Sequence, residues 1–160
     1  MNEDFRIFLA TIWGEAAGCS IAAHRAIASV IMNRVHFREW RKLDTPLAVI
    51  QAGGFDAHTQ KNLPYREAYA AFAPTARPPL PSRLRALEDS VRAIFERLEL
   101  PTTAAVLYFS PKAQAALHVQ DPKRYRQLPA WDFKLLEEVH PEGMLPTDDF
   151  RFFKYGRGQA

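Results

Sequence analysis

Glu15 is the carboxylate whose position in the sequence best suits acid catalysis. It follows Ile12 by three residues and Phe8 by seven, so on a helix it borders the apolar stripe. A carboxyl group beside apolar and aromatic side chains, here Trp13, is partly desolvated, which raises its pKa and keeps its proton bound. Such a group could act as a general acid. The same spacing also fits a glutamate that simply reaches water from the flank of a helix.

The other candidate chemical groups form no recognisable ligand or nucleophile motif. The sequence has five histidines: His24, His36, His58, His118 and His140. No pair of them has a His-x-x-x-His or similar spacing, and Cys19 is the single cysteine. We therefore expect no metal site, no cofactor and no intramolecular disulfide. Arg124 and Arg126 flank Tyr125, but without a nucleic-acid-binding motif we expect a solvated basic face and no nucleic-acid partner.

The composition predicts one ordinary globular domain over residues 1–160. Apolar residues make up 48% of the chain and charged residues 24%, which indicates a buried core. The formal net charge of +3 permits an anionic partner without naming one. No apolar run approaches the ~18 residues of a membrane-spanning helix, and the N-terminus has no signal-peptide pattern. We expect a monomer that is made in the cytoplasm and is not inserted in a membrane.

Helices must position these residues, because the apolar side chains recur mostly at helical spacing. The pattern predicts helices over residues 4–17, 21–36, 46–52, 64–73 and 82–98. Their candidate N-caps are Ser20, Thr45 and Ser82. Gly18 and Gly53 follow helices as natural stops.

The remaining segments predict only a minor β content. Residues 53–62 read as a Gly-rich loop, and residues 102–110 are rich in β formers and predict a short extended segment. After Pro111 the chain is expected to be irregular, with Phe150, Phe152 and Phe153 holding the tail to the core. The predicted fold class is therefore mainly α, with a small β part.

Two sequence segments resemble motifs of the SleB/CwlJ family of cell wall hydrolases. Residues 12–18, Ile-Trp-Gly-Glu-Ala-Ala-Gly, are similar to the family's Tyr-Gly-Glu-Ala-Arg-Gly-Glu run on its first helix. Residues 28–35, Ala-Ser-Val-Ile-Met-Asn-Arg-Val, are similar to the Asn-Arg-Val element that ends its second helix. Weaker similarities follow in the same order, at residues 49–55, 108–111, 129–131 and 150–153.

This resemblance implies a small lysozyme-like enzyme that cleaves peptidoglycan between N-acetylmuramic acid and N-acetylglucosamine. Glu15 matches the family's catalytic glutamate. Lytic transglycosylase relatives use one such residue, first as acid and then as base, and close an anhydro ring on the muramic acid. That scheme needs no partner carboxylate, unlike the scheme of most glycosidases. The positions that we expect to bind substrate are Asn33, Arg34, Phe55, Asp56 and Tyr108.

The sequence departs from the family pattern around this site. Ala17 stands where the family has Arg, Cys19 replaces its second Glu, and Gly54 replaces the Gln before Phe. Asp56 stands in place of Ser, and His58 in place of an aromatic residue. Asp56 could activate water and make the enzyme a hydrolase, or it could form an Asx turn in the loop. These departures leave the product type open.

Several roles stay open at the level of sequence. Arg34 could hold a carboxylate, contact the sugar chain or form a structural ion pair. Tyr108 and Trp131 could pack against a pyranose ring or belong to the core.

Two rival functions also fit the sequence: a non-catalytic cell-wall-binding module and a small basic nucleic-acid binder. Retention of Glu15 argues against the first, and the scarcity of Lys/Arg clusters argues against the second. Without a signal peptide, we expect a phage endolysin or a delivered antibacterial effector that acts on the wall after release.

Overall fold

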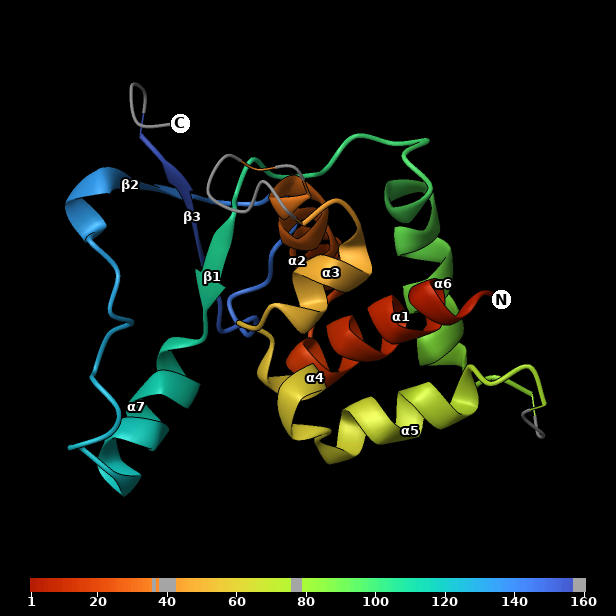
Figure 1. The fold of residues 1–160 in the computed structure, drawn as a ribbon, viewed down its shortest axis with the longest axis horizontal. Helices are drawn as coiled ribbons and strands as arrows, with labels where there is room; N and C mark the ends of the chain where they lie inside the picture. Colours follow the sequence, from red (N-terminus) through yellow and green to blue (C-terminus); the bar gives the residue numbers. More distant parts are fainter. Residues whose placement is uncertain (36, 38–42, 76–78, 157–160) are drawn as a thin grey trace.

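The computed structural model describes residues 1–35, 37, 43–75 and 79–156. Over these residues the chain is mainly helical and carries a small antiparallel sheet (Figure 1), which confirms the predicted fold class. None of the helices in this part of the chain combines the length and the apolar character that a membrane span requires.

Helix α1 (Glu3–Ala16) is the centre of the helical part. It contacts α2 (Ile21–Arg34), α3 (Pro46–Gln51), α4 (Asp56–Gln60), α5 (Leu63–Ala71) and α6 (Ser82–Phe95). In Figure 1 it crosses the middle of the molecule, with α5 below it and α6 on its right. Phe8, Leu9 and Ile12 have no exposed surface, and burying each such side chain contributes roughly 1.5–3 kcal/mol. The carboxyl end of this well-packed helix carries Glu15.

All five predicted helices are present, and each begins within one residue of its predicted start. Ser20 and Thr45 each accept the backbone N–H three residues further on, at 3.2 and 3.1 Å, as N-caps do. Gly18 and Gly53 follow their helices with φ of +88° and +104°, a backbone region that favours glycine. Ser82 does not cap its helix: the preceding proline holds the cap position, and Ser82 is the first helical residue.

Two helices lie where we predicted irregular chain. α4 occupies the predicted loop 53–62; it is only five residues long and buries a single side chain, so it leaves no periodic apolar pattern. α7 (Pro111–Gln120) lies in the region predicted to be irregular, and it buries none of its residues. α2 ends at Arg34 and α6 at Phe95, earlier than predicted, and His36 lies outside the described residues.

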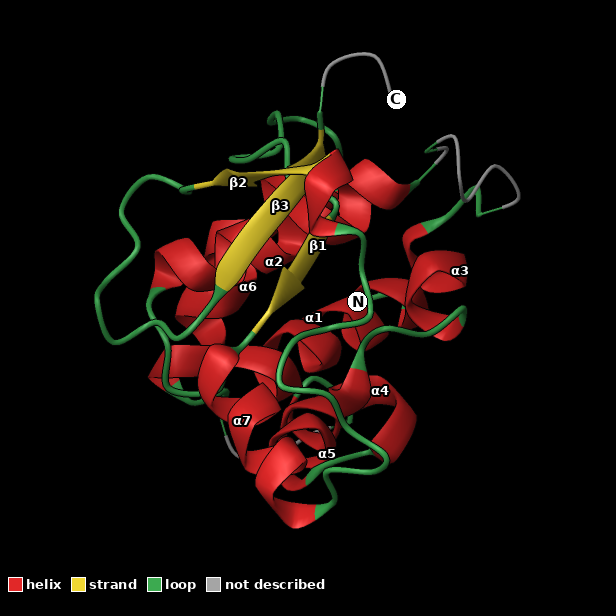
Figure 2. Cartoon of the chain, turned by 90° about the vertical axis from the view of Figure 1, so that its left-hand side faces the viewer, coloured by secondary structure: helices red, strands yellow, loops and turns green. Residues whose placement is uncertain are grey.

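The sheet has the strand order β1-β3-β2, all antiparallel. β1 (Leu107–Phe109) lies within the predicted extended segment 102–110, which is thereby confirmed, and β2 (Leu136–Val139) follows a 3-10 turn. β3 (Arg151–Tyr155) pairs Phe152 with Tyr108, and Phe152 and Phe153 are buried, so the tail is held as predicted. Figure 2 shows this sheet beside the helices, with α7 below it.

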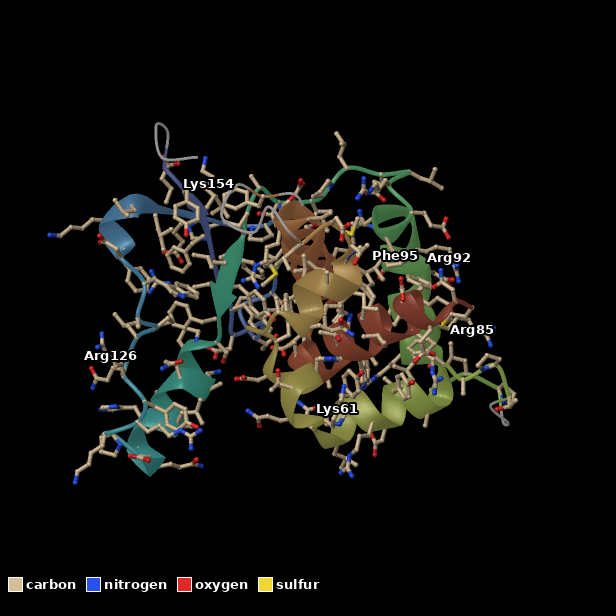
Figure 3. The ribbon with its side chains drawn as sticks, viewed as in Figure 1. Lys61, Arg85, Arg92, Phe95, Arg126 and Lys154 are labelled. Atoms are coloured by element: carbon tan, nitrogen blue, oxygen red, sulfur yellow. The ribbon has the colours of Figure 1, made fainter. Side chains whose placement is uncertain are left out.

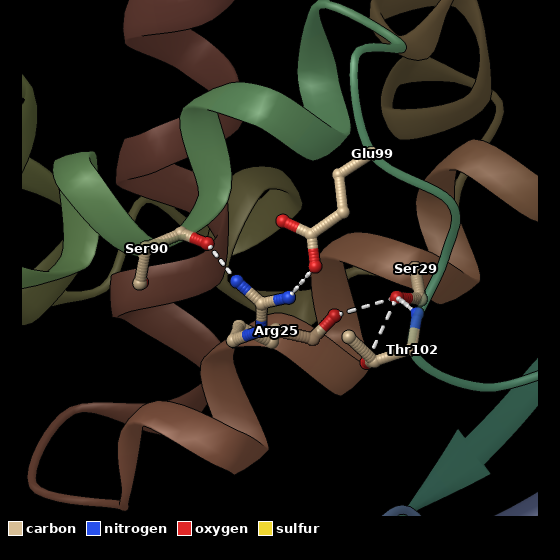
Figure 4. Close-up of polar contacts among 5 residues, drawn as sticks. All are labelled: Arg25, Ser29, Ser90, Glu99 and Thr102. Atoms are coloured by element: carbon tan, nitrogen blue, oxygen red, sulfur yellow. Dashed lines mark hydrogen bonds and ion pairs between the residues drawn. The ribbon is translucent and has the colours of Figure 1, made fainter.

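A polar cluster joins α2 to α6 and to the chain that enters β1 (Figure 4). The Arg25 guanidinium donates to the Ser90 carbonyl at 2.7 Å and pairs with Glu99. The Ser29 hydroxyl donates to the Arg25 carbonyl and accepts the Thr102 N–H, both at 2.8 Å. Because a buried hydroxyl with both roles filled rigidifies its surroundings, this cluster fixes the segment that leads into the strand of Tyr108.

Candidate active site

An open cleft of about 360 Å³ contains Glu15. Its volume lies within the ~300–1,000 Å³ typical of small-ligand sites. One side comes from α1 and α4, the floor comes from β1, and the opposite side comes from α7 and the segment after it. The lining includes Gly14, Glu15, Asp56 and Ala57 on the first side, Tyr108 from β1, and Gln114, Leu117, Pro129 and Trp131 on the opposite side.

The Glu15 carboxyl is half-buried and held by two donors. The Ala57 backbone N–H donates to its Oε1 at 2.7 Å, and the Tyr108 hydroxyl donates to its Oε2 at 3.1 Å. Burial raises the pKa of Glu15 and nearby Asp56 adds to this, whereas the two hydrogen bonds and the charge of Arg34 oppose it. The net shift of the Glu15 pKa is upward, in the direction that the sequence predicts for a partly desolvated carboxyl.

Gly14 allows the Ala57 donor to come this close. A Cβ at residue 14 would lie 2.6 Å from the Ala57 Cβ and 2.9 Å from the Tyr65 Cβ, too close for real side chains. Asn62 reinforces the contact, because its amide donates to the Gly14 carbonyl and its Oδ1 accepts the Tyr65 N–H, both at 3.0 Å. Gly14, Ala57 and Asn62 belong to the site, although the sequence alone does not predict this. A glycine directly before the candidate acid was the one available signal.

Tyr108 and Arg34 surround the other side of the carboxyl. The Tyr108 ring packs against Phe55 and Phe152, and burial raises its pKa well above the ordinary value, so it stays protonated and donates. The Arg34 side chain is buried, donates from Nε to the Val106 carbonyl at 2.6 Å, and lies over the Phe55 ring. An arginine keeps its charge even when buried. Its charge therefore favours the ionised form of Glu15.

Two predicted substrate-binding residues have structural positions instead. The Asn33 amide donates to the carbonyls of Thr103 and Ala105, both at 2.8 Å, and so anchors the approach to β1. Phe55 has no exposed surface. These contacts give both residues a structural role, and their predicted contacts with substrate stay predictions. The type of a residue and its place in a motif do not show which way its side chain faces.

Asp56 is a second carboxylate in the cleft. It is exposed, begins α4 and lines the cleft with Glu15. Its side chain makes no hydrogen bond within the described residues, so the Asx-turn interpretation is not supported. In the same part of the chain, no three His, Cys, Asp or Glu side chains gather as metal ligands.

Positive side chains lie outside the acidic cleft. Figure 3 shows Lys61 beside α4 and α5, and Arg126 at the left edge of the molecule, on the side of α7. Among the described residues, the charged side chains that line the cleft itself are Glu15 and Asp56.

No family model matches the chain, and neither a curated protein nor a solved structure matches it. The lysozyme-like character of the fold therefore stays a prediction.

Tyr108→Phe should raise the pKa of Glu15 further. The Tyr108 hydroxyl donates to the carboxyl and so lowers the pKa of Glu15. Without it, less opposes the rise in pKa that burial causes. Titration of the Glu15 side-chain carboxyl by ¹³C NMR measures the change. Tyr69→Phe is the matched control, because that hydroxyl bonds Glu3. A Glu15 titration midpoint that stays unchanged or falls in Tyr108→Phe would contradict the assigned contact.

Proposed function

We propose that this chain is a peptidoglycan glycosidase of the lytic transglycosylase or muramidase type, with Glu15 as its general acid. The observation that carries the proposal is the Glu15 carboxyl, which lies in an open cleft with its pKa raised by burial and with two donors on its oxygens. The resemblance of residues 12–18 and 28–35 to cell wall hydrolase motifs supports the same conclusion.

The geometry suits proton transfer in both directions. Protonated Glu15 gives its proton to the glycosidic oxygen as the bond from that oxygen to the muramic acid breaks. The carboxylate left behind is stabilised by the Ala57 N–H and the Tyr108 hydroxyl, since hydrogen bonds to charged groups are about twice as strong as neutral ones. It can then take the proton of the muramic acid's own hydroxyl as that oxygen bonds to the anomeric carbon, which closes the anhydro ring.

A hydrolytic mechanism is the second candidate, because Asp56 lines the same cleft. A carboxylate there could orient and deprotonate water, as the base of a two-carboxylate glycosidase does. The two mechanisms give products that differ in mass by one water. The anhydro mechanism is favoured because the Glu15 carboxyl has a raised pKa and a donor on each oxygen, so it can act first as acid and then as base.

Wild-type protein and Asp56→Asn should both release fragments with anhydro-muramic ends from purified sacculi. Mass spectrometry of the soluble products is the measurement, and Asp89→Asn on the exposed face of α6 is the matched control. Hydrated ends that disappear in Asp56→Asn but persist in Asp89→Asn would show that the enzyme is a hydrolase. Binding to sacculi without release of any fragment would instead support the wall-binding module.

The proposed substrate also constrains where the protein works. Peptidoglycan lies outside the cytoplasmic membrane, so we propose that the chain acts after phage-induced release or after delivery as an antibacterial effector.

A further inference from the structure

The wall of the cleft opposite Glu15 carries a fixed amide beside apolar side chains. Gln114 and Leu117 lie three residues apart on α7, which places them on one face of the helix, and both line the cleft. Pro129 and Trp131 complete this wall. The Trp131 ring meets Phe109 edge-on at 5.8 Å between centroids, so the sheet holds it in place.

The following segment of chain orients the Gln114 amide. Gln114 Nε2 donates to the Arg126 carbonyl at 2.6 Å, and one turn later His118 Nδ1 contacts the Tyr125 carbonyl at 2.7 Å. A carbonyl oxygen can only accept, so the amide nitrogen must face Arg126. Oε1 is then the acceptor that Gln114 can offer to a ligand in the cleft, and no donor within the described residues bonds to it.

An acceptor next to an apolar surface matches the chemistry of an acetamido group. That group presents one N–H and one methyl group on a flat amide. We infer that Gln114 is a specificity-determining residue that binds the 2-acetamido group of the substrate sugar. Its Oε1 accepts the N–H, while the methyl group packs against Leu117 and Trp131. The inference rests on the proposed glycosidase function and adds a preference for acetylated over de-N-acetylated sugars.

The same wall disfavours a sugar that has lost its acetyl group. A free amino sugar carries an ammonium group at this position, and Leu117, Pro129 and Trp131 would strip its hydration while offering few acceptors. The carboxylates that line the cleft, Glu15 and Asp56, come from the opposite wall. The protein should therefore prefer acetylated glycan strands to de-N-acetylated ones.

Binding of two defined oligosaccharides tests this inference without catalysis. Calorimetry on Glu15→Gln protein would compare the tetramer of N-acetylglucosamine with the tetramer of glucosamine. We expect at least about tenfold tighter binding of the acetylated tetramer, the effect of one hydrogen bond with its apolar contact. Gln114→Glu should reverse the preference, because the new carboxylate pairs with the ammonium group of the glucosamine tetramer. Gln114→Met removes the acceptor but keeps the apolar wall, so it should weaken binding of the acetylated tetramer and reduce the preference without reversing it.

Gln120→Glu is the matched control, because it makes the same change of charge at an exposed position of α7 that does not line the cleft. It should keep the preference of the parent protein. The inference is overturned if the parent protein shows no preference, or if the preference is unchanged in both Gln114 variants. Cleavage of sacculi by the wild-type protein would still uphold the proposed function in either case. No binding of either tetramer together with no cleavage of sacculi would overturn both.

Discussion

Glu15→Gln should abolish the release of fragments from purified sacculi while leaving the protein folded. Glutamine keeps the shape of the side chain, and its Oε1 can still accept the Ala57 N–H. An amide cannot give a proton to the glycosidic oxygen, and losing a general acid costs at least about 100-fold in rate. The measurement is fragment release by the variant and the wild-type protein at equal concentration.

The stability of this variant separates loss of chemistry from loss of fold. Glu15 has a raised pKa in the folded protein, so it binds its proton more tightly when folded than when unfolded. Wild-type stability therefore falls as pH rises from the ordinary glutamate pKa through the raised one. Glutamine has no such ionisation, so thermal unfolding at neutral pH should show a Tm equal to or above that of the wild type.

Glu67→Gln makes the same chemical change on the exposed face of α5, away from the cleft, and should leave both rate and Tm near the wild-type values. A well-folded Glu15→Gln protein that releases fragments at nearly the wild-type rate would refute the assignment of the acid.

The local part of the site could be predicted from the sequence because it depends on one helix. Phe8, Ile12 and Glu15 fix the buried side of α1 by their spacing alone, and Ser20 fixes the start of the next helix. The contact between Glu15 and Tyr108 spans 93 residues of sequence and forms only when β1 packs on the helices. Motif order brought Tyr108 into the candidate set, but it could not show which atoms meet.

Other parts of the site could not be predicted because no characteristic side chain marks them in the sequence. Ala57 contributes its backbone N–H, which any residue except proline possesses, so its residue type carries no information. α4 and α7 escape prediction because neither has an apolar stripe, although both form walls of the cleft. Asn33 entered the candidate set through the Asn-Arg-Val resemblance, which does not show that its position at the end of α2 directs its amide to backbone carbonyls.

Gly14→Ala should destabilise the protein and slow its release of fragments from sacculi, although alanine is the better helix former. Alanine gains about 1 kcal/mol of helix propensity over glycine. Its Cβ would lie 2.6 Å from the Ala57 Cβ and 2.9 Å from the Tyr65 Cβ, so α4 and α5 must move away from α1. Overpacking of this kind costs about 1–3 kcal/mol, and we expect a net loss of stability in chemical denaturation.

The loss of activity should exceed what the loss of stability explains. Moving α4 takes the Ala57 N–H away from Glu15, and hydrogen bonds to charged groups contribute about 1.5–3 kcal/mol, equivalent to a roughly ten- to hundredfold loss of rate. Gly156→Ala is the matched control, because a Cβ there meets its nearest atom at 3.5 Å. Ala57→Gly in the Gly14→Ala background removes the closest clash and should restore part of the rate. A Gly14→Ala protein as stable and as active as the wild type would show that the close approach of α4 to α1 does not position the acid.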